Sequence, residues 1–402
     1  MKKHLSDLQK KEYSCYLELI AAVINGVTPP VPADEISFNR LYDIATASCT
    51  EAIFADAVIE LSKMHSFDSE FLKVITEKKN HTILSDTVHN YEIERILSQF
   101  EKYQVVNLPM KGYFLKKDYP HSFYRSISDF DILFDISDID KVKNIFSEIG
   151  YKFEKCDEHQ YHFSKKPFMY IEMHKDLVPE SDNCYPYLAN QLKNSLKRDG
   201  YEYSRAMSIE DYYVYMIVHA SKHFKIGGIG LRMVLDEYIF YKKYSDSFDK
   251  EYLAKQLENC GVTVFEKKIR KIAFDWFSEN SVKENFNDVE EYILMSFALG
   301  RLDVAIMSEF EKNSIKEKNG KKKSRARLFL SSVFPSKSRM VYSDAYLEKF
   351  PFLLPFAWGR MWFKRFFIEK NVRIKTGFKN RLAYKEDDVE FFRKIQNEMG
   401  FD

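Results

Sequence analysis

Apolar residues recur every three to four positions through roughly the first hundred residues, a spacing that places them on one face of a helix. The stretches 16–24 and 52–59 show this pattern most clearly, and the proline-rich segment 28–32 separates them. A long amphipathic pattern follows at 84–102. We therefore predict a helical N-terminal region over residues 1–103.

The pattern changes between residues 104 and 178, where short apolar runs typical of strands replace the helical spacing. Serine, glycine and proline mark the ends of these runs. We predict, in order, a strand over 105–110, a strand over 130–136, a helix over 137–149, a strand that begins at 151, and a β-hairpin of 160–164 and 168–174. Residues 104–178 would thus form a small α/β module.

Helical spacing returns after the module. Ser208 and Asp211 form the pattern of a capping box for a helix over 212–224, and the glycines of 227–230 end it before a new helix at Leu231. We predict an α+β fold, in which a small mixed-sheet module is embedded between mostly helical N- and C-terminal regions. The predicted parts after the module are a helical region that closes the cleft (179–315), a basic linker (316–327) and an aromatic-rich helical C-terminal region (328–402).

The composition narrows the classes of protein that fit this pattern. The 402 residues include 61 Lys and Arg and 60 Asp and Glu, so the net charge is +1, which argues against a general electrostatic nucleic-acid binder and an acidic disordered chain. No apolar run approaches the roughly 18 residues of a membrane span, and we expect a cytoplasmic protein. The 5 cysteines include no CxxC pair, so we expect reduced thiols rather than a disulfide framework or a zinc site.

Two acidic residues stand at the start of the strand predicted over 130–136. Successive side chains of a strand point to opposite faces, so Asp129 and Asp131 share one side while Phe130 and Ile132 share the other. Neighbouring carboxylates repel each other unless a cation lies between them, and Mg²⁺ binds one or two carboxylates together with water and phosphate oxygens. An isolated Asp-x-Asp pair is more typical of a solvated strand end. The prediction of phosphate chemistry therefore rests on the residues that surround this pair.

A third carboxylate lies in the second strand of the predicted hairpin. Glu172 and His174 share one face of that strand, and apolar residues occupy the other. If this strand lies beside that of Asp129 and Asp131, the three carboxylates can hold two metal ions roughly 3.5–4 Å apart. One ion would then activate an attacking hydroxyl, and the other would hold a triphosphate and stabilise the leaving pyrophosphate.

Candidate phosphate-binding groups precede these aspartates. Gly112 follows the strand predicted over 105–110 and lets backbone amides approach a phosphate, while Lys111 beside it supplies a positive charge. Arg125 can pair with phosphate oxygens.

This combination resembles the nucleotidyltransferase superfamily related to polymerase β, and more closely the bacterial family of uncharacterised nucleotidyltransferases. The matching motifs here are Lys111-Gly112, Arg125, Asp129-Phe130-Asp131-Ile132-Leu133, Gly150-Tyr151 and Glu172-Met173-His174. The likeness extends to the helical segments 219–223 and 231–236, and to the C-terminal segments 334–336 and 352–356. One departure concerns the turn, where the superfamily usually has Gly-Ser or Gly-Gly and this chain has Gly112-Tyr113.

The resemblance implies a metal-dependent enzyme that moves a nucleoside monophosphate from an NTP to the hydroxyl of a small molecule or a protein and releases pyrophosphate. Mg²⁺ or Mn²⁺ is the implied cofactor, ATP the expected co-substrate, and nucleic acid is not an expected partner. Catalysis and metal binding are assigned to Asp129, Asp131 and Glu172, and nucleotide binding to Lys111, Gly112, Arg125 and Ser128. The alternative is a non-catalytic nucleotide-binding or assembly protein that keeps the fold.

Several basic residues are candidates for the cleft. His219 and His223 lie four residues apart and could bind a metal from one face of a helix, but the glutamate of a zinc-protease motif is missing. We expect these histidines, with Lys222 and His174, to face the cleft and contact substrate, or to cap neighbouring helix ends. Arg232 and Asp236, also four apart, are expected to pair within their helix.

The C-terminal part of the chain contains a basic run and an aromatic segment, each with two interpretations. The basic run 321–327 could contact nucleic acid or an anionic membrane, and a solvated linker is the preferred interpretation. The aromatic segment 356–367 could form an interfacial helix at a membrane surface, and its helical spacing equally suits docking onto the N-terminal helices, which we prefer.

Overall fold

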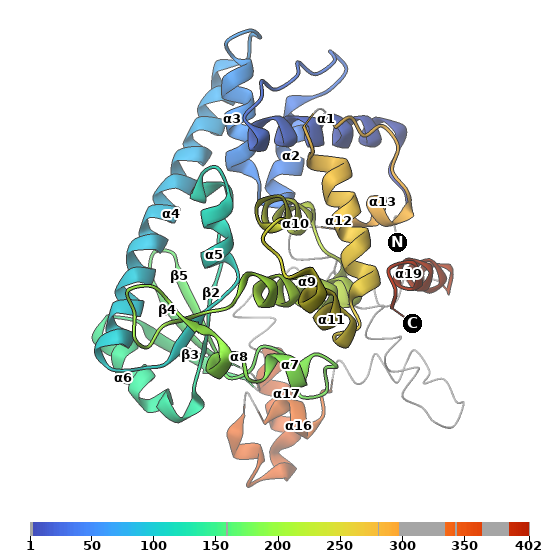
Figure 1. The fold of residues 1–402 in the computed structure, drawn as a ribbon. Coiled ribbons are helices and arrows are strands. Elements are labelled where there is room, and N and C mark those ends of the chain that lie inside the picture. Colours follow the sequence, from blue (N-terminus) through green and yellow to red (C-terminus); the bar gives the residue numbers. More distant parts are fainter. Residues whose placement is uncertain are drawn as a thin grey trace. The chain divides into compact units, whose positions relative to one another are not determined.

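The computed structural model describes residues 3–157, 160–279, 281–296, 334–341, 344–363 and 386–401. The chain divides into two compact units. The first consists of residues 4–222 and 229–299, and the second of residues 1–3, 223–228 and 300–402. The described part is α+β, with one five-stranded mixed sheet and many helices (Figure 1), as predicted.

The predicted helical N-terminal region is confirmed. Its helices are α1 (Asp7–Asn25), α2 (Phe38–Ser48), α3 (Glu51–Leu61) and α4 (Ser69–Lys102). A capping box formed by Ser6 and Gln9 begins α1, and Gly26 ends it in the left-handed conformation at φ 71°. The apolar residues of α1 and α3 pack together, and α3 also contacts α4.

The module over residues 104–178 contains the predicted strands. They are β1 (Asn107–Pro109), β2 (Phe130–Phe134), β3 (Lys152–Cys156), β4 (Gln160–Lys165) and β5 (Met169–His174), in the spatial order β1-β2-β5-β4-β3. Only β2 and β5 are parallel. The predicted helix is present as a 3₁₀ turn (Ile136–Asp138) followed by α6 (Ile139–Glu148). Strand β1 is shorter than the stretch 105–110 that the pattern suggested.

Alternating side chains divide the sheet into an apolar and a polar face. The apolar residues of β2 and β5 pack against α4 and α6 in one core, which includes Ile96, Phe100, Phe130, Ile132, Phe146, Ile171 and Met173. Figure 1 shows α4 and α6 beside the sheet. Because Phe130 pairs with Ile171 and Ile132 with Met173, the residues between them, Asp131 and Glu172, are left together on the opposite face.

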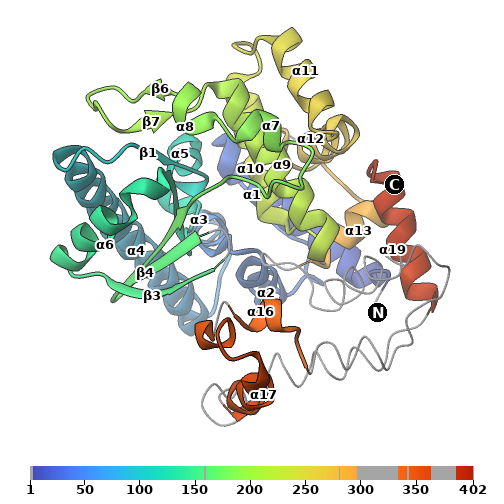
Figure 2. The same ribbon diagram turned by 90° about the horizontal axis from the view of Figure 1, so that it is seen from below.

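The chain after the module is helical, with one exception. The helices are α7 (Tyr185–Leu188), α8 (Gln191–Asn194), α9 (Ile209–Gly227), α10 (Leu231–Tyr244), α11 (Lys250–Asn259), α12 (Thr263–Phe277) and α13 (Asp288–Leu294). Ser208 accepts a hydrogen bond from the Asp211 amide at 3.0 Å, which confirms the predicted cap. The exception is a two-stranded sheet of β6 (Leu196–Lys197) and β7 (Arg205–Ala206), which lies beside β1 (Figure 2).

The prediction of reduced thiols is wrong for two of the five cysteines. Cys184, which precedes α7, and Cys260, which follows α11, form a disulfide across 76 residues of sequence. Cys15, Cys49 and Cys156 are free. The spacing of cysteines along the chain does not reveal such a pair, because the two residues meet only after the helices between them have packed.

The described C-terminal elements belong to the second unit. They are α16 (Lys337–Met340), two 3₁₀ turns (Ala345–Leu347 and Pro351–Leu353), α17 (Leu354–Phe363) and α19 (Glu386–Glu398). The indole of Trp358 donates to the Pro335 carbonyl at 2.9 Å. The predicted linker 316–327 and residues 364–367 of the aromatic segment lie outside the described residues. Among the helices that are described, none combines the length and the apolar character needed to cross a membrane.

Candidate metal centre

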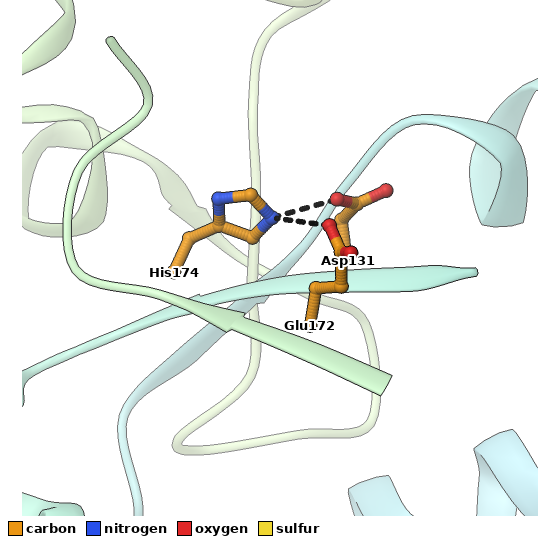
Figure 3. A group of neighbouring side chains, drawn as sticks. All are labelled: Asp131, Glu172 and His174. Carbon is orange, nitrogen blue, oxygen red and sulfur yellow. Dashed lines mark hydrogen bonds and ion pairs between the residues drawn. The ribbon is translucent and has the colours of Figure 1, made fainter. Parts of the chain in front are cut away.

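Three side chains converge on the polar face of the sheet, where β2 and β5 run side by side. One ligand atom from each of Asp131, Glu172 and His174 lies within 4.8 Å of the other two (Figure 3). The cause is local: Asp131 and Glu172 are partners in the parallel β2–β5 register, and His174 follows Glu172 by two residues and so shares its face. The three residues offer two carboxylates and one imidazole to a common point.

Asp131 is the buried member of this group. Its side chain is 2% exposed, and its Oδ1 accepts from Lys111 Nζ at 2.6 Å and from His174 Nε2 at 2.7 Å. Burial alone would raise the pKa of Asp131, but the charge of Lys111 and the hydrogen bond from His174 outweigh it and hold the pKa well below its usual value. Asp131 is therefore a carboxylate at neutral pH.

Glu172 lies in a different electrostatic environment. Its Oε2 is 3.7 Å from His174 Nε2, and its Oε1 is 3.5 Å from His162 Nδ1. Burial, followed by the charges of Asp131 and Asp129, raises the pKa of Glu172 to about 7. A cation among these carboxylates would reverse that shift, because it would favour the charged form of Glu172.

His162 contacts Glu172 from the next strand and is not among the predicted site residues. His162 on β4 is the register partner of Glu172 on β5 and is almost fully buried. Its Nε2 lies 2.8 Å from Asp157 Oδ2, and its Nδ1 lies 2.9 Å from the Tyr170 hydroxyl. The predicted hairpin contained the signal, because pairing its two strands places a histidine beside the glutamate.

Asp129 lies close to the centre but outside the three-residue group. It immediately precedes β2, is partly exposed, and accepts a hydrogen bond from the Ser128 hydroxyl at 2.8 Å. Its charge nevertheless acts on Glu172, whose pKa it helps to raise. The roles of Asp129 in metal binding and of Ser128 in nucleotide binding stay predictions.

The Lys111-Gly112 turn contacts Asp131 through the lysine side chain. Lys111 has the unusual φ of 48°, and its carbonyl accepts from the Tyr212 hydroxyl at 2.6 Å. Burial opposes the charge of Lys111, but Asp131 outweighs it and raises the lysine pKa. The turn thus directs the ammonium group of Lys111 at Asp131, while Gly112 begins the short helix α5 (Gly112–Leu115).

Arg125 has a protein partner. Its Nε and Nη2 donate to the two carboxylate oxygens of Asp236 at 2.7 and 2.9 Å. The expected pair of Arg232 with Asp236 is wrong, because Asp236 binds Arg125 and the Tyr119 hydroxyl, and Arg232 donates instead to the Ser126 carbonyl at 3.2 Å. Nucleotide binding by Arg125 stays a prediction, and the structure places its guanidinium behind Gly112, where an added Cβ would lie 2.4 Å from Nη1.

The predicted cleft residues on α9 lie along one helix. Tyr215 on α9 is buried, and its pKa is raised by burial and by the charges of Asp131, Asp129 and Glu172, against the opposing charge of Lys111. The His219 ring lies one turn further on, 6.1 Å from the ring of Tyr215. Lys222 follows in the same unit, and His223 belongs to the second unit. Contact of these residues with substrate stays a prediction.

A comparison with models of known protein families shows the family of this chain. A family model described as "Uncharacterised nucleotidyltransferase" matches residues 34–278, which is more than half of the chain. The matched part begins before α2 and extends to the end of α12, so it includes Asp131, Glu172 and His174. No curated protein and no solved structure matches.

Proposed function

Since the chain belongs to the family of uncharacterised nucleotidyltransferases, we propose that it transfers a nucleoside monophosphate from an NTP, expected to be ATP, to a hydroxyl group of a small molecule or a protein. The observation that supports this most is the β2–β5 register, which brings Asp131 and Glu172 together on one face of the sheet. Carboxylates paired in this way suit a divalent metal ion and the phosphate groups that it binds.

The donor set fits a divalent ion. Asp131 is ionised, Glu172 has a pKa that a cation would lower, and His174 adds a nitrogen within the same 4.8 Å group. Asp131, Glu172 and His174 would hold the ion. Asp129, two residues before Asp131 in the sequence, is a further carboxylate. When bound, Mg²⁺ or Mn²⁺ would neutralise triphosphate charge and make an acceptor hydroxyl easier to deprotonate. A second ion, held with Asp129, is part of the same proposal.

The side chains of this chain supply the rest of the reaction. A bond forms between the acceptor oxygen and the α-phosphorus, and the bond from that phosphorus to the pyrophosphate oxygen breaks. Glu172 would complete the cluster beside Asp131 and help to activate the acceptor hydroxyl, whose proton passes to water. Lys111 is suited to transfer its ammonium contact from Asp131 to a phosphate oxygen, and Ser128 and Gly112 are expected to contact the same triphosphate.

A second candidate is a nucleotide-binding or assembly protein without turnover. The observation in its favour is that two of the predicted phosphate-binding cations already have carboxylate partners: Lys111 binds Asp131, and Arg125 binds Asp236. In a protein that only binds nucleotide, these pairs could persist throughout. In the enzyme, at least Lys111 must exchange its partner.

The test is incubation of the full chain with each of four NTPs labelled at the α-phosphate, with Mg²⁺ or Mn²⁺ and a panel of hydroxyl-bearing acceptors. We expect label in one acceptor class and release of an equal amount of pyrophosphate. Asp131→Asn should abolish both, because the buried carboxylate is lost. Asp140→Asn, which makes the same change at an exposed position of α6, is the matched control and should retain both activities.

The outcomes separate the two candidates. Metal-dependent binding of a non-hydrolysable NTP, lost in Asp131→Asn, with no pyrophosphate from any native NTP would favour the binding protein. Equal NTP binding by the native protein and Asp131→Asn would contradict both candidates.

A further inference from the structure

The metal centre contains a nitrogen donor. His174 Nε2 lies 2.7 Å from Asp131 Oδ1 and 3.7 Å from Glu172 Oε2, and Figure 3 shows its ring edge directed between the two carboxylates. A ring nitrogen at such distances can share one ion with both carboxylates, because ligand atoms bound about 2.1 Å from a common ion lie roughly 3 Å apart when their bonds are perpendicular.

The nature of the donor affects which ion the site prefers. Mg²⁺ is a hard ion that binds oxygen ligands and keeps much of its water, whereas imidazole suits Fe, Ni, Cu and Zn, and Mn²⁺ is the weakest binder of that first-row series. Two carboxylates and one imidazole form a mixed set in which oxygen ligands accept either ion and the nitrogen favours the transition metal. The donor set is therefore better matched to Mn²⁺ and the ions that follow it in the first row than to Mg²⁺.

We propose that His174 is a direct ligand of the metal ion and that it makes this centre selective for a first-row transition-metal ion such as Mn²⁺ over Mg²⁺. The inference rests on the proposed function only in placing the ion at the same three residues. It adds the identity of the ion, because the proposed reaction can use either Mg²⁺ or Mn²⁺.

The surroundings of the centre support a site for a doubly charged ion. Asp131, Glu172 and Asp129 can contribute three negative charges, and Lys111 contributes one positive charge at 2.6 Å from Asp131 Oδ1. The ammonium of Lys111 and the imidazole of His174 both contact this oxygen. A divalent ion bound there would balance the remaining charge, and His174 Nε2 would exchange its contact with Asp131 for a bond to the ion.

The alternative role of His174 is positional. In that case its Nε2 only donates to Asp131 and holds the carboxylate in place, while the ion has oxygen ligands alone. The two roles differ in what a spectroscopic probe would detect, because only a direct ligand couples its nitrogen nucleus to the electron spin of bound Mn²⁺.

The experiment uses the full chain and Mn²⁺ alone. Binding is followed by the loss of the free Mn²⁺ electron paramagnetic resonance signal, and Mg²⁺ is then added as competitor. We expect displacement of Mn²⁺ to need at least about a tenfold excess of Mg²⁺. Electron spin echo envelope modulation of bound Mn²⁺ should show ¹⁴N coupling. Both measurements on the native protein are independent of any variant.

A variant pair gives a second readout. His174→Gln places an oxygen or amide group near the former Nε2, and it should weaken Mn²⁺ binding by about 10- to 100-fold, remove the ¹⁴N coupling and change Mg²⁺ binding little. His65→Gln, at an exposed histidine between α3 and α4, is the matched control and should bind both ions as the native protein does.

Three results would overturn the proposal: absence of Mn²⁺ binding, absence of ¹⁴N coupling in the native protein, or displacement of Mn²⁺ by an equal concentration of Mg²⁺. Equal weakening of both ions by His174→Gln would assign the positional role instead. These outcomes are distinct from failure of the proposed function. A protein that transfers nucleotides with an all-oxygen Mg²⁺ site contradicts this inference alone, and one that binds Mn²⁺ through His174 without releasing pyrophosphate contradicts the transferase alone.

Discussion

Arg125 and Asp236 form a bidentate ion pair that joins the segment before β2 to α10, across 111 residues of sequence. Both side chains are largely buried, with 12% and 6% of their surface exposed. A guanidinium held at two oxygens has little freedom to rotate, so its remaining nitrogen, Nη1, has a fixed position. That position lies directly behind Gly112.

We predict that Gly112→Ala destabilises the protein because of this guanidinium. The added Cβ would lie 2.4 Å from Arg125 Nη1 and 3.1 Å from an Ile127 carbon, so the pair must shift, at a cost of about 2 kcal/mol. The measurement is urea unfolding. The same substitution in an Arg125→Lys background should cost less, because lysine has no Nη1, with a coupling of about 1 kcal/mol.

Gly359→Ala is the control for this prediction. An added Cβ at Gly359 meets no atom within 4 Å, and alanine is the better helix former, so this variant should be neutral or slightly stabilised. Equal losses for Gly112→Ala in both backgrounds would show that the guanidinium does not impose the glycine.

A second prediction concerns His162, which contacts Glu172 without belonging to the three-residue group. His162→Phe keeps the ring but removes the contacts with Asp157, Tyr170 and Glu172. Groups that orient a metal ligand typically contribute 10- to 100-fold to metal affinity, so we expect Mn²⁺ to bind about tenfold more weakly. Isothermal titration calorimetry measures this change.

The control for His162 is Tyr170→Phe, which removes only the hydroxyl that contacts Nδ1. It should change Mn²⁺ affinity by less than about threefold, since Asp157 still holds the ring. If His162→Phe binds Mn²⁺ as tightly as the native protein, then His162 has no part in placing Glu172.

The sequence pattern was sufficient for features that depend on neighbouring residues. Alternation within a strand placed Asp131 and Glu172 on polar faces, and glycine and serine signals located the cap of α9 and the start of α10. Two features could not be predicted, because each joins residues that are distant in sequence: the pair of Arg125 with Asp236 and the disulfide. The contact of His162 with Glu172 differs from these, because pairing the two strands of the predicted hairpin places the two side chains next to each other. The single parallel pair β2–β5, on which the candidate metal centre depends, entered the prediction only as a condition.

A third prediction concerns the pH dependence of folding, through a buried glutamate far from the metal centre in sequence. Glu237 on α10 accepts from the Tyr213 hydroxyl at 2.5 Å, and the same hydroxyl contacts Glu266 on α12 at 2.7 Å. Burial raises the pKa of Glu237 to about 8, with a smaller contribution from Glu266 and opposition from the hydrogen bond of Tyr213. The folded protein therefore keeps a proton that the unfolded chain has lost.

The sign follows from that difference in proton binding. Between the unfolded value near 4.5 and the folded value near 8, the folded state binds more protons, so the free energy of unfolding falls as pH rises, by up to roughly 1 kcal/mol per pH unit. Glu237→Gln is neutral throughout and should gain stability relative to the native protein between pH 5 and 8. Urea unfolding at several pH values measures this, with the exposed Glu251→Gln as control. A constant difference between the native protein and Glu237→Gln across that range would show that Glu237 is ionised in the folded state.

The last prediction concerns the disulfide between Cys184 and Cys260, which encloses 76 residues of sequence and includes α7 to α11. A cross-link of this length restricts the unfolded chain, and its reduction should lower the free energy of unfolding by about 4 kcal/mol. We expect dithiothreitol to lower the urea midpoint of the native protein but not that of the Cys184→Ala, Cys260→Ala double variant. The control is Cys156→Ala, at an exposed free cysteine, which should keep the full response to the reductant.

The same bridge predicts that Cys184 and Cys260 are oxidised in the cell. The cytoplasm, expected from the sequence, keeps most thiols reduced, whereas the structure joins these two residues where α7 begins and α11 ends. Alkylation at the moment of lysis, followed by mass spectrometry, should modify Cys15, Cys49 and Cys156 after denaturation and leave Cys184 and Cys260 unmodified. Alkylation of all five, together with an unfolding midpoint that dithiothreitol does not change, would contradict the bridge. It would also restore the expectation of reduced thiols.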